Sequence, residues 1–183
     1  GQSVWGKPVG KDNVYKARVV KNDFDWVGFS EPHIPMEDLI IYELHVRGFT
    51  KDESSGLCEA ERGTFEGLRK KIPYLKELGV NAVQILPIFD QANDERQDSI
   101  REDGTKREFN WGYNPLNYNA LDGIYSQDPF DGYTKVREFK ELVKAYSNAG
   151  MNIIMDVVYN HVNSANRSNF DILMPNYYFR YSD

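Results

Sequence analysis

The hydrophobic positions of this chain follow two periods that alternate along its length. Apolar runs rich in β-branched and aromatic residues predict strands over residues 38–49, 81–89 and 152–159. Between these runs, apolar residues recur every three or four positions, which predicts amphipathic helices after Thr64 and over residues 134–148. The order strand, helix, strand, helix, strand, with right-handed crossovers, predicts a parallel α/β sheet.

Residues with special backbone preferences mark the ends of these elements. Thr64 is a candidate cap for the first helix, and Gly79 and Gly150 end the two helices. Pro73 lies within the first helix, where it removes a backbone hydrogen bond at a cost of about 3 kcal/mol, so we expect a kink. Apolar residues on both sides of Asp156 predict that the third strand is covered on both faces.

Two architectures share this order of elements, an open doubly wound sheet and a closed barrel. A dinucleotide-binding open sheet carries a G-x-G-x-x-G turn after its first strand, and the sequence RGFTKDESSG has no such spacing. The connection over residues 90–133 is far longer than the roughly 2 to 6 residues that are usual between a strand and a helix. Its length and its position after a parallel strand predict a binding loop.

Composition narrows the candidate partners. The formal net charge is -6 and no lysine or arginine run offsets the acids, which argues against nucleic acid and anionic membranes. One cysteine and three scattered histidines give no zinc-binding spacing. No stretch approaches the roughly 20 apolar residues of a membrane span, so we expect a soluble protein of unknown compartment.

Residues 1–35 differ from the rest of the chain. They are polar, contain three prolines and hold one short strand candidate at residues 15–20. We predict that they form a linker or lead-in and that the alternating strands and helices follow it. With 183 residues, the chain is shorter than the roughly 250 residues of a complete eight-stranded barrel.

Aromatic and amide side chains alternate within the long connection, in the sequence FNWGYNPLNYNALDGIYSQDP at residues 109–129. Flat apolar faces beside bidentate amides suit a pyranose sugar, whose ring face is apolar and whose rim carries hydroxyl groups. An ordinary rigid loop, which uses the same residue types, is the alternative. The side chains concerned are those of Trp111, Tyr113 and Tyr118 with Asn110, Asn114, Asn117 and Asn119.

Two motifs resemble those of a known family. DVVYNHV, at residues 156–162, resembles the first signature region of the α-amylase superfamily, glycoside hydrolase family thirteen. NWGYNPLNYNALDGIYSQDP resembles the signature of type I pullulanases, a debranching branch of that superfamily. Three further segments match in the expected order, namely IIYELHVRGFT, FEGLRKKIPYLKELGVNAVQILPIFD and DGYTKVREFKELVKAYSNAGMNIIMDVVYNH.

The resemblance implies an α/β fold that is part of a TIM (β/α)8 barrel. It would contain the first three parallel strands and two helices, with a long loop after the second strand. Residues 36–183 would be the amino-terminal part of a glycosidase barrel. Residues 1–35 would be the lead-in that follows a missing carbohydrate-binding module.

For three residues the resemblance implies roles around the sugar at the cleaved bond. Asp156, at the carboxyl end of the third strand, would hold an arginine near the nucleophile and tune that carboxylate. His161 would donate a hydrogen bond to the sugar, and Tyr113 would stack on the same ring. Each has an ordinary alternative: a strand-end acid that caps backbone amides, a core histidine and a loop-core tyrosine.

Other matches carry weaker implications. Asn160 corresponds to a calcium ligand in many α-amylases, so calcium is a candidate ion, although no acid cluster at calcium spacing accompanies it. Asn110, Trp111 and Asn114 are further substrate-binding candidates, with structural roles as the alternative. Phe109 and Asn114 depart from the pullulanase signature, which has tyrosine and aspartate there, and isoamylase-like debranching enzymes also have asparagine at the second position.

The resemblance also implies an activity. Retaining glycosidases need two carboxyls about 5 to 5.5 Å apart, and in this superfamily they lie on the fourth and fifth strands. The chain ends before a fourth strand, so we expect it to lack the nucleophile and general acid and to be inactive alone. The intact enzyme would hydrolyse α-1,6 branch links in pullulan, amylopectin or glycogen, without an organic cofactor.

Alternative functions share the same motifs. A non-catalytic sugar-binding relative of the superfamily would carry every motif described above, whereas an unrelated open-sheet ligand-binding domain would have helices on both faces of its sheet. The expected partners are an α-glucan and, at the open edge of the sheet, the remainder of the barrel or a second copy of the chain.

Overall fold

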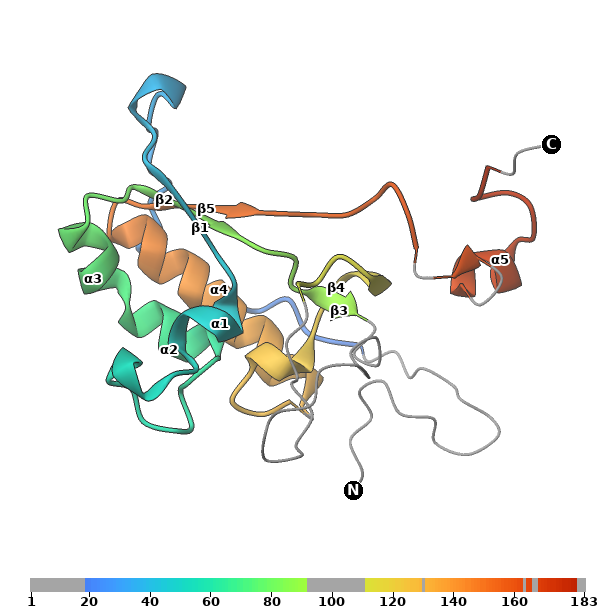
Figure 1. Cartoon of the computed structure of the whole chain (residues 1–183), viewed down its shortest axis with the longest axis horizontal. Coiled ribbons are helices and arrows are strands. Elements are labelled where there is room, and N and C mark those ends of the chain that lie inside the picture. Colours follow the sequence, from blue (N-terminus) through green and yellow to red (C-terminus); the bar gives the residue numbers. More distant parts are fainter. Residues whose placement is uncertain (1–18, 92–110, 130, 163, 166–167, 181–183) are drawn as a thin grey trace, which may run out of the picture.

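The computed structural model of the chain describes residues 19–91, 111–129, 131–162, 164–165 and 168–180. No described helix is long and apolar enough to cross a membrane. The strands and α-helices of Figure 1 are β1 (Ile41–Leu44), α1 (Val46–Thr50), α2 (Phe65–Lys70), α3 (Ile72–Glu77), β2 (Ala82–Ile85), β3 (Phe89–Gln91), β4 (Pro115–Leu121), α4 (Gly132–Asn148), β5 (Asn152–Met155) and α5 (Asn169–Leu173). Short 3-10 helices lie at Met36–Asp38, Glu53–Ser55 and Gly123–Tyr125.

Three strands form a parallel sheet in the order β1, β2, β5, as predicted. Val83 in the central strand pairs with Tyr42 of β1 on one side and with Ile153 of β5 on the other. Ala82, Val83 and Ile85 are fully buried, so the central strand is the most enclosed of the three. Because the strands are parallel, their carboxyl ends lie at the same edge of the sheet.

Helices α2, α3 and α4 pack on one face of this sheet (Figure 1). Successive strand residues point to opposite faces, and Leu44 and Ile85 join Leu142 of α4 in the apolar core on the helical side. Glu43 and Gln84 point to the other face, where Gln84 Nε2 donates to Glu43 Oε2 at 3.3 Å. Helices on a single face are the arrangement of a barrel wall rather than of a doubly wound sheet.

The first and third strands are shorter than predicted. The predicted strand at residues 38–49 was wrong beyond Leu44, because α1 begins at Val46 and His45 Nδ1 caps it by accepting from the Gly48 N–H at 3.0 Å. β5 ends at Met155, and its residues are half-buried rather than covered on both faces. β5 lies at the edge of the sheet, so one of its sides has no neighbouring strand among the described residues.

The long connection after β2 has a small sheet of its own. The predicted strand at residues 81–89 divides in two, because β2 ends at Ile85 and β3 begins at Phe89, after Pro87. β3 pairs antiparallel with β4, with Phe89 opposite Leu121. The described part of the predicted binding loop therefore contains an antiparallel strand pair beside the carboxyl ends of the parallel strands (Figure 1).

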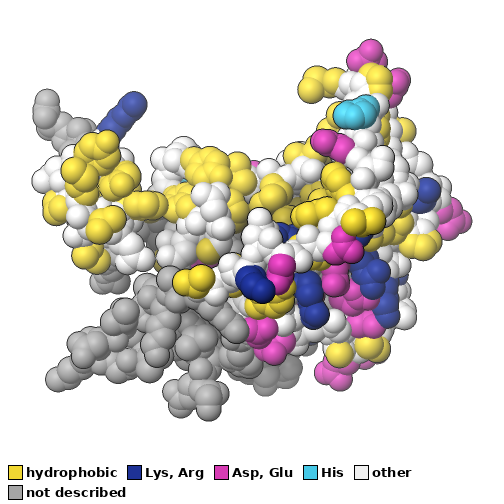
Figure 2. Space-filling view, turned by 180° about the vertical axis from the view of Figure 1, so that it is seen from behind, with side chains coloured by type: hydrophobic (Ala, Val, Ile, Leu, Met, Phe, Trp, Pro, Cys, Tyr) yellow, Lys and Arg dark blue, Asp and Glu magenta, His cyan; other side chains and the backbone are white. Residues whose placement is uncertain are grey.

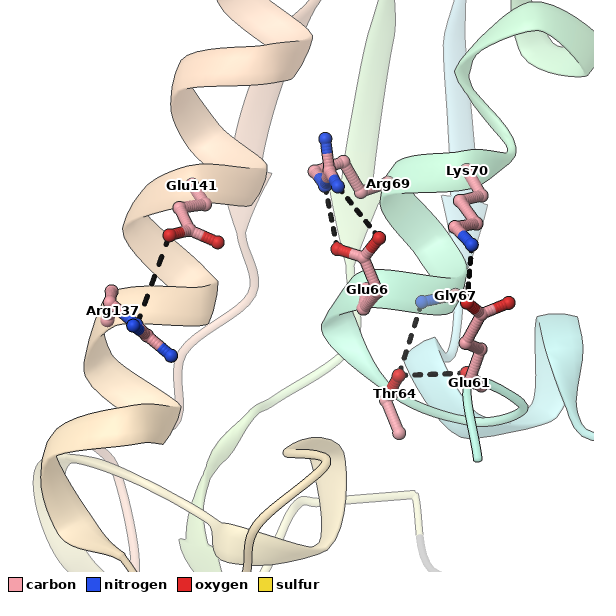
Figure 3. A network of polar contacts seen from close by, with 8 residues as sticks. All are labelled: Glu61, Thr64, Glu66, Gly67, Arg69, Lys70, Arg137 and Glu141. Carbon is pink, nitrogen blue, oxygen red and sulfur yellow. Dashed lines mark hydrogen bonds and ion pairs between the residues drawn. The ribbon is translucent and has the colours of Figure 1, made fainter. Parts of the chain in front are cut away.

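The predicted helices are present, with one division. Thr64 caps α2 by accepting from the Gly67 N–H at 3.2 Å (Figure 3). The expected kink is a break at Lys71, after which α3 carries Pro73 in its first turn, where the missing N–H costs no helical hydrogen bond. α4 begins two residues earlier than predicted because Asp131 Oδ2 accepts from the Thr134 N–H at 3.1 Å.

The described part of the lead-in, residues 19–35, contains no helix or strand, and residues 22–25 lie along α4. Lys140 Nζ donates to Asn22 Oδ1 at 2.8 Å, and Lys144 Nζ donates to the Asp25 carbonyl at 2.9 Å. The predicted strand at residues 15–20 is absent at residues 19–20, and its other residues lie outside the described ones. The boundary between lead-in and barrel stays a prediction.

Gly67 allows a test of the close contact between α2 and the preceding turn. A Cβ at this position would lie 2.2 Å from the Glu61 carbonyl oxygen, whereas glycine to alanine inside an ordinary helix stabilises by about 1 kcal/mol. We therefore expect Gly67→Ala to lower the free energy of unfolding by roughly 1 to 3 kcal/mol, as overpacking does. Urea unfolding measures the change, Glu141→Ala on exposed α4 surface is the control, and a raised midpoint for Gly67→Ala would contradict the contact.

Candidate functional site

Three predicted site residues lie together at the carboxyl edge of the parallel sheet. Tyr113 Oη donates a hydrogen bond to Asp156 Oδ2 at 2.8 Å. His161 Nε2 lies 2.7 Å from the Tyr113 carbonyl oxygen, so the ring nitrogen carries the proton and donates it. The expected proximity of these side chains is confirmed, and their roles toward a sugar stay a prediction.

The sheet sets the position of Asp156. Its backbone N–H donates to the Ile85 carbonyl at 3.0 Å, which continues the β2 and β5 pairing one residue beyond β5. Asp156 shares the strand alternation of Asn152 and Ile154, so it belongs to the face without helices. In a barrel that face is the interior, and side chains at its carboxyl end face the substrate.

A close backbone approach sets the position of Tyr113. The preceding residue, Gly112, has φ +92, and a Cβ there would lie 2.4 Å from the Pro87 carbonyl and 2.9 Å from Gln91 Oε1. No side chain fits between these atoms without a backbone shift. Glycine therefore lets this loop lie directly on the segment between β2 and β3.

The electrostatics of Tyr113 keep its hydroxyl protonated. Burial, the hydrogen bond to Asp156 and the negative charges of Asp156 and Glu43 raise the pKa of Tyr113 to about 12. The hydroxyl is therefore a hydrogen-bond donor at neutral pH, and the bond to Asp156 fixes the ring. A fixed aromatic face, a carboxylate and an imidazole at one edge are groups that can bind and orient a neutral sugar.

The remaining predicted site residues differ in how far the structure describes them. Trp111 is 56% exposed, and Asn114 is half-buried beside Tyr113 on the same loop. Asn110 lies outside the described residues. Asn160 is exposed, and no group of three His, Cys, Asp or Glu side chains able to hold a metal ion occurs in the described part of the chain. Calcium binding at Asn160 stays a prediction.

A buried charged cluster under the hairpin was missed from the sequence. Asp90 of β3, Asp122 after β4 and Lys135 of α4 are almost fully buried, and Asn117 Nδ2 donates to Asp90 Oδ2 at 2.5 Å. Burial raises the pKa of Asp90 and raises the pKa of Asp122 to about 6, while burial lowers the pKa of Lys135 against the attraction of both acids. Asp122 Oδ2 has no hydrogen-bond partner in the structure.

A second buried polar chain joins the hairpin to the end of β1. Gln91 Nε2 donates to Tyr125 Oη at 3.2 Å, and that oxygen lies 3.3 Å from His45 Nε2. Because His45 Nδ1 already accepts from the Gly48 N–H, Nε2 carries the proton of the neutral ring. His45 therefore donates to Tyr125. The sequence placed His45 in a strand and gave no signal that it would bridge two elements.

A parallel sheet with helices on one face and polar and aromatic side chains gathered at its carboxyl edge is typical of TIM-barrel enzymes. A family model described as "Alpha amylase, catalytic domain" matches residues 34–180. The chain belongs to this α-amylase catalytic domain family.

Named relatives lie within its debranching branch. Isoamylase 3 from the chloroplast of Oryza sativa subsp. japonica is 43% identical over 145 residues, which cover 78% of this chain. Pullulanase of Bacillus subtilis is 34% identical over 181 residues, which cover 93% of this chain. The alignments span only 18% and 24% of those two relatives.

Solved structures agree with the fold. The crystal structure of Paenibacillus barengoltzii pullulanase, in complex with maltohexaose and α-cyclodextrin, matches with a TM-score of 0.75 at 37% identity. The match covers 86% of this chain and 25% of that chain. The described sheet and helices are thus part of a TIM-barrel catalytic domain, and the partial-barrel fold is confirmed.

The buried Asp122 gives the chain a testable pH dependence. Because the folded-state pKa is raised from 3.8 to about 6, the protonated acid stabilises the fold fully below pH 3.8, and this contribution is lost as pH rises through about 6. Asp122→Asn cannot ionise and keeps an oxygen for the Ile124 N–H. Between pH 4 and pH 7.5, the free energy of unfolding of the wild type should therefore fall by about 1 to 3 kcal/mol more than that of the variant.

Urea unfolding at several pH values measures this difference. Asp38→Asn, at an exposed aspartate, is the matched control and should follow the wild-type profile. Identical profiles for Asp122→Asn and wild type would show that Asp122 does not titrate in this range.

Proposed function

We propose that this chain forms the amino-terminal part of the catalytic barrel of a retaining debranching glycosidase. The observation that carries the proposal is the contact of Tyr113, Asp156 and His161 at the open carboxyl edge of the sheet. This edge is where barrel enzymes bind their substrates. Membership of the α-amylase catalytic domain family and the names of the relatives support the activity.

Each of the three residues has a role that its geometry supports. The Tyr113 ring, fixed through its hydroxyl, presents a face on which a glucose ring at the cleaved bond can stack. Asp156 accepts a hydrogen bond from that hydroxyl. Its carboxylate lies at the edge of the sheet, where it can orient an arginine beside the nucleophile. His161 positions the Tyr113 backbone and can turn its N–H toward a sugar hydroxyl when substrate enters.

The proposed substrate is an α-glucan with α-1,6 branch links, such as pullulan, amylopectin or glycogen. Relatives named pullulanase, isoamylase and glycogen debranching enzyme support this substrate class. Double displacement needs two carboxyls from the fourth and fifth barrel strands, and the protein residues alone supply the chemistry. No nucleic acid is expected as a partner, in agreement with the net charge of -6.

The exposed edges of the sheet support a partner within the barrel. β1 and β5 are the outer strands of the described sheet, and Ile41 on the face without helices is 48% exposed. Unpaired strand edges and apolar side chains of this kind are normally covered. We propose that the remainder of the barrel covers these strand edges. Without that remainder, a second copy of the chain would cover them.

A chimaera tests the proposed activity. Residues 34–180 replace the aligned segment of the Bacillus subtilis pullulanase, and reducing sugar released from pullulan is measured. We expect the chimaera to hydrolyse pullulan and the 183-residue chain to release nothing, because the chain aligns with only 24% of that pullulanase and double displacement needs carboxyls of the fourth and fifth barrel strands. Turnover by the chain alone would contradict its assignment as part of a barrel. A folded chimaera without activity would favour a non-catalytic sugar-binding relative.

Two substitutions of Tyr113 distinguish the effect of ring stacking from that of the hydrogen bond to Asp156. In the chimaera, we expect Tyr113→Ala to lower kcat/KM for pullulan about a hundredfold, because the sugar loses its orienting face. Tyr113→Phe keeps the ring and loses only the bond to Asp156, so a loss of about tenfold is expected. Tyr74→Ala, at an exposed tyrosine of α3 outside the candidate site, is the control. Equal losses for Tyr113→Ala and Tyr113→Phe would argue against stacking.

A further inference from the structure

A group of aromatic rings beside the candidate site has no part in the mechanism proposed above. Tyr159, which lies between Asp156 and His161 in the chain, is 63% exposed. Its ring stacks on Tyr118 of β4 with centroids 5.9 Å apart and planes at 22°. The contacts continue from Tyr118 to Phe170 of α5 at 5.5 Å and from Phe170 to Tyr178 at 5.0 Å. Tyr118, Tyr159, Phe170 and Tyr178 together are called the aromatic surface below.

Tyr159 is exposed and yet held in one position. Its Oη donates to Asn119 Oδ1 at 3.1 Å, and Phe89 of β3 lies 6.4 Å from its ring, on the inner side of the hairpin. Asn119 has φ +58, a left-handed conformation that non-glycine residues seldom adopt. An exposed ring fixed by stacking and by its hydroxyl loses little conformational entropy when a ligand binds.

The chemistry of the aromatic surface fits a neutral sugar chain. Amide side chains adjoin the rings: Asn119 accepts from the Tyr159 hydroxyl, and Asn169, next to Phe170 in the chain, donates to Asn117 Oδ1 at 3.5 Å. Ring faces beside amides match the apolar face and hydroxyl rim of glucose. The exposed side chains of Ile172 and Leu173 on α5 are aliphatic, and they widen the apolar area at the α5 end of the molecule in Figure 2.

The aromatic surface is continuous with the candidate site. Tyr118 Oη donates to the His161 carbonyl at 2.5 Å, and the His161 ring donates to the Tyr113 carbonyl. Tyr159 and Asp156 belong to the same short segment after β5. A sugar chain that stacks on Tyr113 therefore meets the aromatic surface when it extends past His161.

We propose that the aromatic surface binds further glucose units of an α-glucan chain held at the candidate site, with Tyr159 as the principal stacking residue. The proposal rests on the proposed function for the identity of the sugar. It assigns the tyrosines after β5 to substrate binding rather than to packing. It also gives a reason why an exposed tyrosine is fixed at both its face and its hydroxyl.

Calorimetric titration of the 183-residue chain with maltohexaose tests this site. We expect Tyr159→Ala to weaken binding about three- to tenfold, the effect of removing one aromatic stacking partner. Tyr159→Phe keeps the ring but loses the bond to Asn119, so a smaller loss is expected, and it serves if Tyr159→Ala fails to fold. Tyr74→Ala is the matched control, since Tyr74 is 47% exposed on α3, and it should bind as the wild type does.

Several results would overturn the proposal. Unchanged affinity in Tyr159→Ala, equal losses in Tyr159→Ala and Tyr74→Ala, equal binding of the β-linked cellohexaose, or no binding by the wild-type chain would each do so. A lowered melting temperature of Tyr159→Ala in the chimaera, with unchanged affinity for maltohexaose, would assign the ring to packing instead.

Tyr113→Ala in the same titration separates this proposal from the proposed function. Loss of binding in Tyr113→Ala alone supports sugar binding at the candidate site and counts against binding at the aromatic surface. Loss in Tyr159→Ala alone supports the aromatic surface and counts against stacking at Tyr113. Losses in both variants support a continuous binding surface.

Discussion

The candidate site depends on the pairing of β2 with a parallel strand on each side. Both edges of β2 are hydrogen-bonded, so its backbone groups are satisfied within the sheet and its side chains can be fully buried. Parallel pairing also brings the carboxyl ends of three strands to one edge. Asp156 extends this pairing through its N–H to the Ile85 carbonyl, so the hydrogen bonds that form the sheet also place the site carboxylate.

The other half of the site comes from a hairpin that the sheet does not contain. β3 leaves β2 after Pro87, and β4 returns antiparallel to it, which brings the loop before β4 back over the end of β2. Gly112 lies directly on the Pro87 carbonyl, and the next residue, Tyr113, reaches Asp156. Sheet and hairpin meet at the hydrogen bond between these two residues, which explains why residues more than forty positions apart form one site.

Sequence patterns predicted the order of elements and the proximity of Tyr113, Asp156 and His161 better than the lengths of the strands. Periodicity identified the helices and Thr64 predicted the cap correctly, because these signals are local. Pro73 predicted a kink within one helix, whereas the structure has two helices and places Pro73 in the first turn of the second. The β1 strand was overestimated because β-branched and aromatic residues continue into α1, and only the contact of His45 with the Gly48 N–H reveals the turn. The β3 and β4 pairing and the buried Asp122 depend on contacts between distant segments, which composition and period do not encode.

The buried charges under the hairpin show what the arrangement of the site requires. Two carboxyls and one lysine are enclosed where apolar side chains would cost less desolvation, and one oxygen of Asp122 lacks a partner. An apolar contact between hairpin and α4 would fix their relative orientation less, because the hydrophobic effect is not directional. Charged and amide groups accept few orientations, and the Asn117 to Asp90 bond lies on the same strand pair that carries Tyr113 toward Asp156. A strand pair held in one orientation by these polar bonds also holds the loop before β4, and with it Tyr113, beside Asp156.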